Sequence, residues 1–415
     1  MTLIENAVCP FCGLGCDDIA IERTQNGITP RPTGCPQADR LFNRSASPGT
    51  GPRVAGSPAT LDQAVEAAGK HLSGRRSPLV AGMQTDVAGV LAALSLAGRI
   101  GASVDHRHSD GLFRNVSVMQ RLGWTVTTLA ELRNRADLVL VVGPDPVASY
   151  PRFWERWVAP KPAYLPEGTA REVVFLGGAP AADTVTALGR APTCIAEGAD
   201  ITDSVTALRL AVEGRGDGAF ADLAKRLLGA RYAVVVWAAG MFSEAGSDLT
   251  VESIVRLVRT VDITTRCSGL PLSGTDNLAG ANYACVWRTG FPLRTSFEGG
   301  SLRHDPDGLA WHRRMGTADA VLWISSFRAE VPAIDSTGPS VVLAPPETSF
   351  EREPDVFIPV GTPGIDHAGD VFRSDGVLTL HANPLIDRGL PSTVDVLKRI
   401  DATLAATLTE SGSCL

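Results

Sequence analysis

The sequence shows no long hydrophobic segment, no signal-peptide pattern in its first residues and no basic stripe. Its most apolar run, VAGVLAALSLAG from Val87, is shorter than the roughly 20 apolar residues that cross a bilayer. The N-terminus, MTLIENAV, has neither the basic residues nor the apolar stretch of a signal peptide, which predicts a cytoplasmic protein. The net charge of −7 and the pI near 5.6 argue against a nucleic-acid partner.

The common phosphate-binding signatures are also missing. Neither GxGxxG nor GxxxxGKS/T follows any of the predicted strands. The turns that do follow them are GPDP, LGGAP, WAAGM and VGTPG. Ligands bind at the carboxyl ends of strands in open α/β sheets, so these turns are either binding loops or plain tight turns.

Short apolar runs alternate with helical patterns along most of the 415 residues. Apolar residues make up 44% and charged residues 20%, which is an ordinary globular composition. The runs lie in PLVAG, ADLVLVVGPDP, EVVFLGG, YAVVVWAAG, ADAVLWISS, SVVLAPP and DVFIPVGTPG. Strands that are apolar throughout predict parallel sheets covered by helices on both faces. The sequence therefore predicts an α/β fold of two interleaved parallel-sheet lobes.

Composition shifts predict how these lobes are divided. The predicted segments are a cysteine-rich head at 1–50, the first part of lobe I at 51–160, lobe II at 161–340 and a return to lobe I at 341–415. The stretch at 47–60 is rich in Gly, Pro and Ser and is predicted to be a linker. Thr60 and Gln63 have the spacing of a capping box, which predicts a helix that begins directly after Thr60.

Half of the eight cysteines fall within the first 35 residues. Their spacing is C-x2-C-x3-C, then eighteen residues, then a fourth cysteine. Three close thiolates with small glycines between them suit an iron–sulfur cluster. Zinc is less favoured, because there is no second CxxC and no histidine in the first 70 residues. The candidate 4Fe-4S ligands are Cys9, Cys12, Cys16 and Cys35, and the alternative is a loop that binds no metal.

Asp105, His106, His108 and Asp110 form a second polar group after a predicted strand. A polar loop is the favoured interpretation. Positions 106 and 108 would share a face in an extended segment, so a divalent ion with oxygen and nitrogen ligands is the alternative.

From CPFCGLGCDDIAIE and GCPQADRLF onward, the sequence resembles the B subunit of formylmethanofuran dehydrogenase, a member of the molybdopterin oxidoreductase superfamily. The resemblance continues in order through GASVDHRHSDG, ELRNRADLVLVVGPDPVASYPRF, PLSGTDNLAGANYACVWRTGFP, FIPVGTPGIDHAGDVFRSDGV and LPSTVDVLKRI. It covers nearly the whole chain and implies lobes of the formate dehydrogenase type. Large members end in an extra barrel over one pterin. We expect this chain to lack that barrel, so that a cofactor-bearing version would need a partner to supply it.

Active members of this family hold tungsten or molybdenum between two pterin guanine dinucleotides and reduce carbon dioxide to formate. By resemblance, the candidate pterin contacts are Thr275, Asp276, Asn277, Gly361, Thr362 and Gly364. An equally good explanation is that these residues are kept because they form tight turns, in a chain that no longer binds the cofactor.

The sequence departs from the active family at the metal. Where that family carries a metal-binding cysteine followed by histidine, this chain has Gly111 and Leu112, which have no donor atom. Asp110 is a carboxylate one position away that could take the place of the thiolate. With this departure, the chain resembles more closely the B subunit of the bacterial formyltransferase/hydrolase complex, which converts formyl-tetrahydromethanopterin to formate by way of methylofuran.

This resemblance implies a non-catalytic scaffold in one-carbon metabolism, without tungsto- or molybdopterin and without catalytic residues of its own. The implied partners are the amidohydrolase-type A subunit, the C subunit and the formyltransferase D subunit of the same complex. A retained cluster would then staple the head to the body. One alternative is an active bis-pterin formylmethanofuran (formate) dehydrogenase subunit. Another, a free-standing zinc or electron-transfer protein, would leave most of the chain without a purpose.

Overall fold

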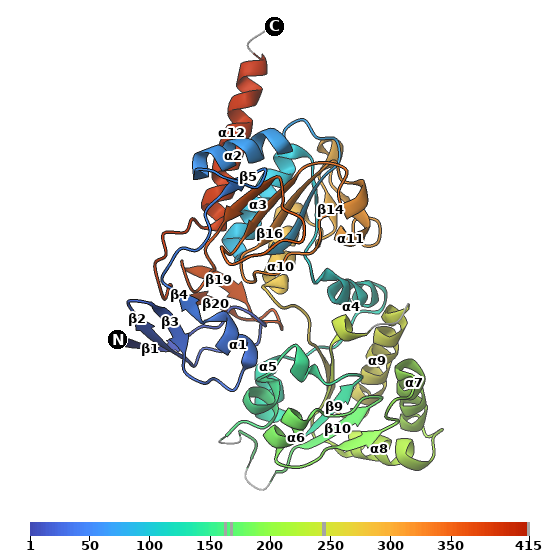
Figure 1. Ribbon diagram of the computed structural model, residues 1–415. Coiled ribbons are helices and arrows are strands. Elements are labelled where there is room, and N and C mark those ends of the chain that lie inside the picture. Colours follow the sequence, from blue (N-terminus) through green and yellow to red (C-terminus); the bar gives the residue numbers. More distant parts are fainter. Residues whose placement is uncertain (162–163, 167–168, 243–245, 413–415) are drawn as a thin grey trace. The chain divides into compact units, whose positions relative to one another are not determined.

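The computed structural model describes residues 1–161, 164–166, 169–242 and 246–412, with side chains up to 406. The chain forms two compact units (Figure 1). Unit 1 comprises Met1–Ser109 and Thr275–Leu415, and unit 2 comprises Asp110–Gly274. In the described part of the chain, no helix is both long and apolar enough to span a membrane.

The main sheet of unit 1 is mixed, in the order β15-β14-β8-β7-β16-β17-β18-β5-β6. Its central strands, from β8 to β18, are parallel, and the strands at both edges are antiparallel. The strands are β5 (Arg53–Val54), β6 (Ser57–Pro58), β7 (Pro78–Gln84), β8 (Ser103–Val104), β14 (Thr295–Ser296), β15 (Arg303–His304), β16 (Ala320–Ser325), β17 (Ser340–Ala344) and β18 (Val356–Pro359).

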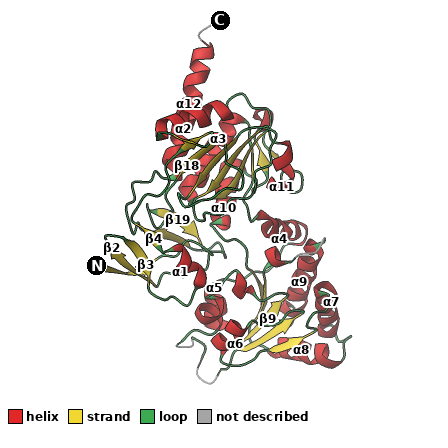
Figure 2. Cartoon of the chain, viewed as in Figure 1, coloured by secondary structure: helices red, strands yellow, loops and turns green. Residues whose placement is uncertain are grey.

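Helices cover this sheet, as Figure 2 shows. They are α2 (Leu61–Leu72), α3 (Val87–Ile100), α10 (Leu278–Thr289), the short α11 (Trp311–Arg314) and α12 (Thr393–Gly412). Helix α12 packs against both α2 and α3, while the side chains of Leu79, Val321 and Trp323 pack with Trp311 of α11. The predicted capping box is confirmed: Thr60 Oγ1 accepts from Gln63 N, and Gln63 Oε1 accepts from Thr60 N.

The cysteine-bearing N-terminal segment of unit 1 has its own antiparallel sheet. Its strands are β1 (Thr2–Ala7), β2 (Ile19–Thr24), β3 (Gly27–Pro30) and β4 (Arg44–Ser45), and helix α1 (Pro36–Leu41) lies between the last two. The hairpin of β19 (Gly369–Phe372) and β20 (Thr379–Ala382) contacts this segment, because the amide of Ser374 donates to the carbonyl of Gly13 at 2.7 Å. Short 3-10 turns η4 (Glu298–Gly300) and η5 (Met315–Thr317) complete unit 1.

Unit 2 is a five-stranded parallel sheet in the order β11-β10-β9-β12-β13. The strands are β9 (Leu138–Val142), β10 (Glu172–Leu176), β11 (Thr193–Ile195), β12 (Ala233–Trp237) and β13 (Cys267–Pro271). The helices are α4 (Ser109–Leu122), which begins at the end of unit 1, α5 (Leu129–Arg135), α6 (Ala182–Leu188), α7 (Ile201–Val212), α8 (Gly218–Gly229) and α9 (Ser247–Asp262), with shorter turns η1 (Pro146–Ala148), η2 (Trp154–Val158) and η3 (Ala239–Met241).

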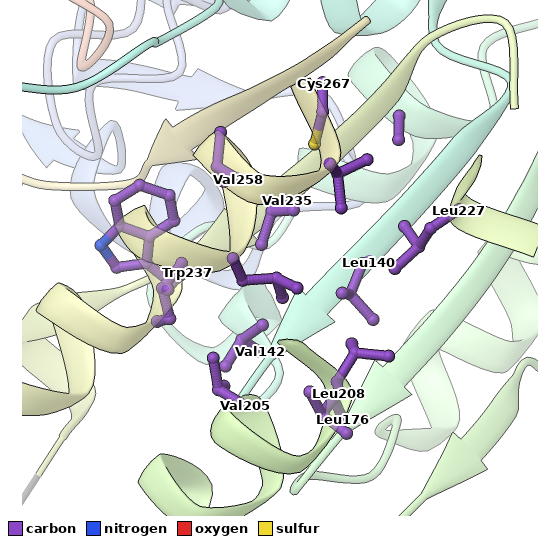
Figure 3. Close-up of a cluster of buried hydrophobic side chains, with 14 of the residues drawn as sticks. Leu140, Val142, Leu176, Val205, Leu208, Leu227, Val235, Trp237, Val258 and Cys267 are labelled. Atoms are coloured by element: carbon purple, nitrogen blue, oxygen red, sulfur yellow. The ribbon is translucent and has the colours of Figure 1, made fainter. Parts of the chain in front are cut away.

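Alternate side chains of these strands pack on opposite faces of the sheet. Leu140, Val142 and Val235 meet Leu208 and Val258 in the core beneath α7, α8 and α9 (Figure 3). The intervening side chains are equally buried on the other face, toward α5, α6 and η2. The predicted α/β class, with strands buried on both faces, is therefore confirmed.

The sequence prediction differs from the structure at two boundaries. The stretch 47–60 is not a plain linker, since β5 and β6 lie within it and Val54 pairs with Val356 of β18. The two units divide the chain at 109/110 and 274/275, whereas the predicted lobes met at 160/161 and 340/341. Every apolar run forms a strand, but a run's composition does not say which of two buried sheets it joins.

Candidate functional site

The first three predicted cluster ligands lie on the loop between β1 and β2. The amide of Cys9 donates to the carbonyl of Cys16 at 2.8 Å and closes this loop. Gly13 and Gly15 have φ angles of 75° and 69°, in the left-handed region that glycine adopts most readily. The glycines between the cysteines therefore turn the loop, as the sequence predicted.

The fourth predicted ligand, Cys35, is the N-cap of α1, and its Sγ accepts from the amide of Ala38 at 3.4 Å. All four cysteines are buried. Burial raises the pKa of Cys9 well above its ordinary value, and the charges of Cys12, Cys16 and Cys35 raise it further. Burial likewise raises the pKa of Cys12, so the thiols of Cys9 and Cys12 stay protonated in the absence of a metal.

The donor set fits a 4Fe-4S cluster in number, chemistry and burial. Cysteines ligate metals as thiolates, so metal binding would release the thiol protons. In the part of the chain that the structure describes, no three or more Cys, His, Asp or Glu side chains are arranged as a formed metal site. Cluster binding therefore stays a prediction that rests on which donors are present.

A buried ion pair lies beside the cysteine loop. Arg328 Nε donates to both carboxylate oxygens of Asp276 at 2.8 Å, and its Nη2 donates to Gln37 Oε1 at 3.3 Å. The positive charge of Arg328 also acts on Cys12, whose pKa it lowers against the larger raising effect of burial. Gln84 Nε2 donates to Asp276 at 2.7 Å.

Sequence reasoning missed two members of this group. Gln84 ends β7 and Arg328 follows β16, so both lie at the carboxyl edge of the parallel strands. They are 192 and 52 residues away from Asp276 along the chain. No local pattern marks either residue, because only the pairing of β7 with β16 brings them together.

Asp276 itself is fully buried and bears a charge. Burial opposes the charge, but His108, with Nε2 at 3.4 Å, and Arg328 hold the pKa of Asp276 below its ordinary value. Its amide donates to Phe11 O in the cysteine loop at 2.6 Å. A carboxylate so fully engaged by the protein is not available to a pterin.

The side chain of the neighbouring pterin candidate, Asn277, is also hydrogen-bonded within the protein. Asn277 Nδ2 donates to Thr85 O at 2.9 Å, and its Oδ1 accepts from the amide of Phe372 at 2.9 Å. The carbonyl of Thr275 accepts from the amide of Leu278 as α10 begins. Asn277 thereby ties the start of α10 to α3 and to the β19–β20 hairpin.

The second group of pterin candidates, at 361–364, also lies near the cysteine loop, at Pro10. A Cβ added at Gly364 would lie 2.7 Å from Ala382 Cβ and 3.6 Å from Pro10 Cγ, while one at Gly361 would lie 2.8 Å from Asp366 Cβ. Both glycines are therefore required by close packing within the protein. Thr362 differs, since its buried Oγ1 has no hydrogen-bond partner among the described residues.

The polar loop at 105–108 is built into the core of unit 1. The carboxylate of Asp105 accepts from the amides of His106 at 2.8 Å and Trp311 at 2.9 Å and lies 3.4 Å from Arg294 Nε. Burial raises the pKa of Asp105 to about 6 and lowers that of His106 to about 3. These contacts support the favoured interpretation as a structural polar loop. Among the described residues, no group of three or more Cys, His, Asp or Glu side chains is arranged to hold the divalent ion of the alternative interpretation.

The position that the resemblance matches to the metal-binding thiol lies in unit 2, within α4. A Cβ added at Gly111 would lie 2.5 Å from Gly240 N and 2.6 Å from Gly240 Cα. Real Cβ atoms do not approach backbone so closely, so the 3-10 turn after β12 fills the space of a side chain. Leu112 is half-buried and Asp110 is exposed.

The sequence of this chain is similar to the sequences of known proteins. No protein-family model matches the chain. It is 29% identical over 379 residues to the B subunit of the formyltransferase/hydrolase complex Fhc of Methylorubrum extorquens, and the match covers 87% of this chain and 99% of the relative. It is 24% identical over 401 residues to the B subunit of tungsten-containing formylmethanofuran dehydrogenase 2 of Methanocaldococcus jannaschii, covering 90% and 92%.

A solved structure shows the same fold. A chain in the X-ray crystal structure of the formyltransferase/hydrolase complex (FhcABCD) from Methylorubrum extorquens in complex with methylofuran matches with a TM-score of 0.75 at 29% identity, covering 86% of this chain and 99% of that one. In sequence, the chain is thus similar to a B subunit of formylmethanofuran dehydrogenase, which confirms the predicted resemblance. It is similar to the Fhc B subunit in sequence, and its fold is similar to that of a chain of the FhcABCD complex.

Proposed function

We propose that this chain is the B subunit of a formyltransferase/hydrolase complex in the cytoplasm. It would work there with an amidohydrolase-type A subunit, the C subunit and a formyltransferase D subunit in the conversion of formyl-tetrahydromethanopterin to formate. Similarity to the Fhc B subunit over nearly the full length of that protein supports the assignment. In this proposal the chain is a scaffold that carries no catalytic residue.

The contact between Gly111 and Gly240 is the observation that carries the scaffold role. Tungsten or molybdenum needs a protein donor or an open position at this point of the related enzymes. Here the backbone of Gly240 lies 2.5 Å from where a Cβ at 111 would stand, so a thiolate at this position does not fit. Asp276 and Asn277 do not fit a pterin either, since their polar groups are satisfied within the protein.

The cysteine head does fit its predicted group. Cys9, Cys12, Cys16 and Cys35 would hold a 4Fe-4S cluster, which would cross-link the β1–β2 loop to the start of α1. Such a bond stabilises a segment too small to build a core of its own. Arg328, fixed by Asp276, supplies a positive charge beside Cys12. In this proposal the cluster is a structural cross-link within the head.

Elemental analysis of the purified complex tests the proposal. We expect iron without stoichiometric tungsten or molybdenum, and no reduction of a viologen dye by formate. Formyltransferase and hydrolase activity should co-purify with the chain. Tungsten or molybdenum at one per chain, together with dye reduction, would instead establish the active dehydrogenase and refute the scaffold role.

A further inference from the structure

Unit 2 contains a cavity whose described lining includes none of the residues of the sites described above. It has a volume of about 330 Å³. It lies between β10, the end of α6 and residues that precede β10, which are Val158, Ala159, Pro160, Lys161, Tyr164, Leu165, Thr169 and Arg171. Strand β10 begins at Glu172, and α6 runs back from the opposite edge of the sheet to end at Leu188. The cavity therefore opens at the amino ends of the strands, whereas the turns after β9, β10 and β12 lie at the carboxyl ends.

The lining of the cavity combines an apolar body with cations. Val158, Leu165 and Val173 are among its apolar side chains, while Lys161 and Arg190 are exposed cations that line it as well. None of the described residues that line it is acidic. A cavity of this size and character suits a small ligand with one anionic group on an apolar frame.

Arg171 holds the inner wall of the cavity in place. Its Nε donates to Ala136 O at 2.7 Å and its Nη2 to Leu132 O at 3.0 Å, while Nη1 donates to Val158 O. Burial lowers the pKa of Arg171 to about 10, so the guanidinium stays charged at neutral pH. Its donors are used by the protein, and its charge adds a fixed positive potential.

The local backbone is unusual at the same place. Trp154–Val158 form a π-helix, a rare element that occurs frequently at functional sites. Arg133 lies over the rings of Trp157, at 5.1 Å, and Tyr164, at 4.6 Å, and so fixes the end of this π-helix against the segment that follows it. The cavity wall is thus held by two arginines rather than by hydrophobic contacts alone.

We propose that this cavity binds a small organic anion, with its carboxylate, phosphate or sulfonate at Lys161 and Arg190 and its apolar frame against Val173 and α6. The proposal is independent of the scaffold role, since the lining is distinct from the cysteine head and from Gly111. It assigns unit 2 a ligand at the edge of the sheet opposite to the usual binding edge.

Fluorescent probes of matched shape test it on the purified full-length chain. Anilinonaphthalenesulfonate carries a sulfonate on an aromatic frame, and N-phenylnaphthylamine has the same frame without charge. Lys161→Glu should weaken binding of the sulfonate on the order of tenfold, because a charge is reversed at a few ångströms, and should leave the neutral amine unchanged. Lys225→Glu, the same change at an exposed lysine of α8 that does not line the cavity, should alter neither.

A second variant tests the cavity itself. Ala187→Trp would fill the cavity and should abolish saturable binding of both probes, whereas Ala182→Trp, at the exposed start of the same helix, should leave both unchanged. Circular dichroism would verify that each variant is folded. The proposal is overturned if the sulfonate shows no saturable binding, if Lys161→Glu behaves like Lys225→Glu, or if Ala187→Trp behaves like Ala182→Trp.

Discussion

Arg328 Nε lies 2.8 Å from each carboxylate oxygen of Asp276. The side chain of Asp276 is completely buried and that of Arg328 is 12% exposed, so the pair is almost shut off from water. The cysteine loop is attached to the same point, because the amide of Asp276 donates to Phe11 O. This ion pair therefore joins the head of unit 1 to the carboxyl edge of its main sheet.

Removal of one partner of this pair should be costly. Arg328→Gln leaves the carboxylate of Asp276 buried without its main counter-charge, which typically destabilises a protein by about 3–5 kcal/mol. The measurement is the free energy of unfolding in urea. Arg40→Gln is the matched control, since Arg40 pairs with Glu330 at 3.0 Å but both are more than half exposed. The control should lose less than about 1 kcal/mol, and an equal loss in the two variants would contradict the role of the buried pair.

His106 should make stability depend on pH. Its pKa is about 3 in the folded chain, against about 6.5 in an unfolded chain. Between these values the unfolded state binds more protons, so stability falls as pH falls from about 6.5, by up to about 1.4 kcal/mol per pH unit. His106→Gln removes this effect. The difference in unfolding free energy between the chain and the variant should therefore shrink as the pH is lowered.

Asp105 should change stability with pH in the direction opposite to His106. Its pKa of about 6 is raised above the unfolded value of about 3.9, so the folded state binds more protons between them and gains stability as the pH falls. This opposite trend should persist in His106→Gln between about pH 6 and 4. If the variant and the chain change in parallel across this range, the burial of a neutral imidazole at His106 is wrong.

How far the sequence predicts this protein depends on the range of the interactions. Local signals succeeded: the Thr60 capping box, the glycines of the cysteine loop and the apolar strands all appear as expected. Long-range contacts within the chain could not be predicted from the sequence. Gln84 and Arg328 come close to Asp276 only because of the order of the strands in the sheet. The prediction of a plain linker at 47–60 was wrong. Strand β5 has only two residues, and so short a strand needs no apolar pattern to pair with β18.

At the candidate site, too, local features could be predicted from the sequence and long-range contacts could not. Spacing identified the four cysteines that the structure buries together, and the resemblance placed Gly111 at the position of the missing thiol. The sequence did not reveal that the backbone of Gly240 occupies the space beside it, since the two glycines are far apart along the chain and lie on different elements. It also did not reveal that Asp276 and Asn277 are committed to the fold rather than open to a ligand.

Cys12→Ser should remove the predicted cluster. One ligand of four is lost, so iron content and the brown absorbance near about 400 nm should both disappear from the purified complex. Cys267→Ser is the matched control, because Cys267 is a buried cysteine of β13 in unit 2 that belongs to no predicted site. Loss of iron in the control alone, or an unchanged spectrum in Cys12→Ser, would remove the head as the place of the cluster.

The packing of Gly111 against Gly240 predicts a loss of stability for substitution by alanine at Gly111 and almost no change at Gly240. In an ordinary exposed helix position, Gly→Ala stabilises by roughly 1 kcal/mol. At Gly111 the new methyl would lie 2.5 Å from Gly240 N, so the backbone must shift, and we expect a net loss of about 1–3 kcal/mol in unfolding free energy. A Cβ at Gly240 comes no closer than 4.0 Å to Gly111 Cα, so Gly240→Ala should be nearly neutral.

Urea unfolding of both variants distinguishes a filled site from an open one. If the space beside Gly111 were an open metal pocket, Gly111→Ala would be tolerated and Gly111→Cys would supply the missing thiolate. In a filled site both variants lose stability, and Gly111→Cys takes up neither tungsten nor molybdenum when it is produced with an excess of either metal. Greater stability in Gly111→Ala, or metal bound by Gly111→Cys, would show that this position can still accept a ligand and would end the case for a scaffold.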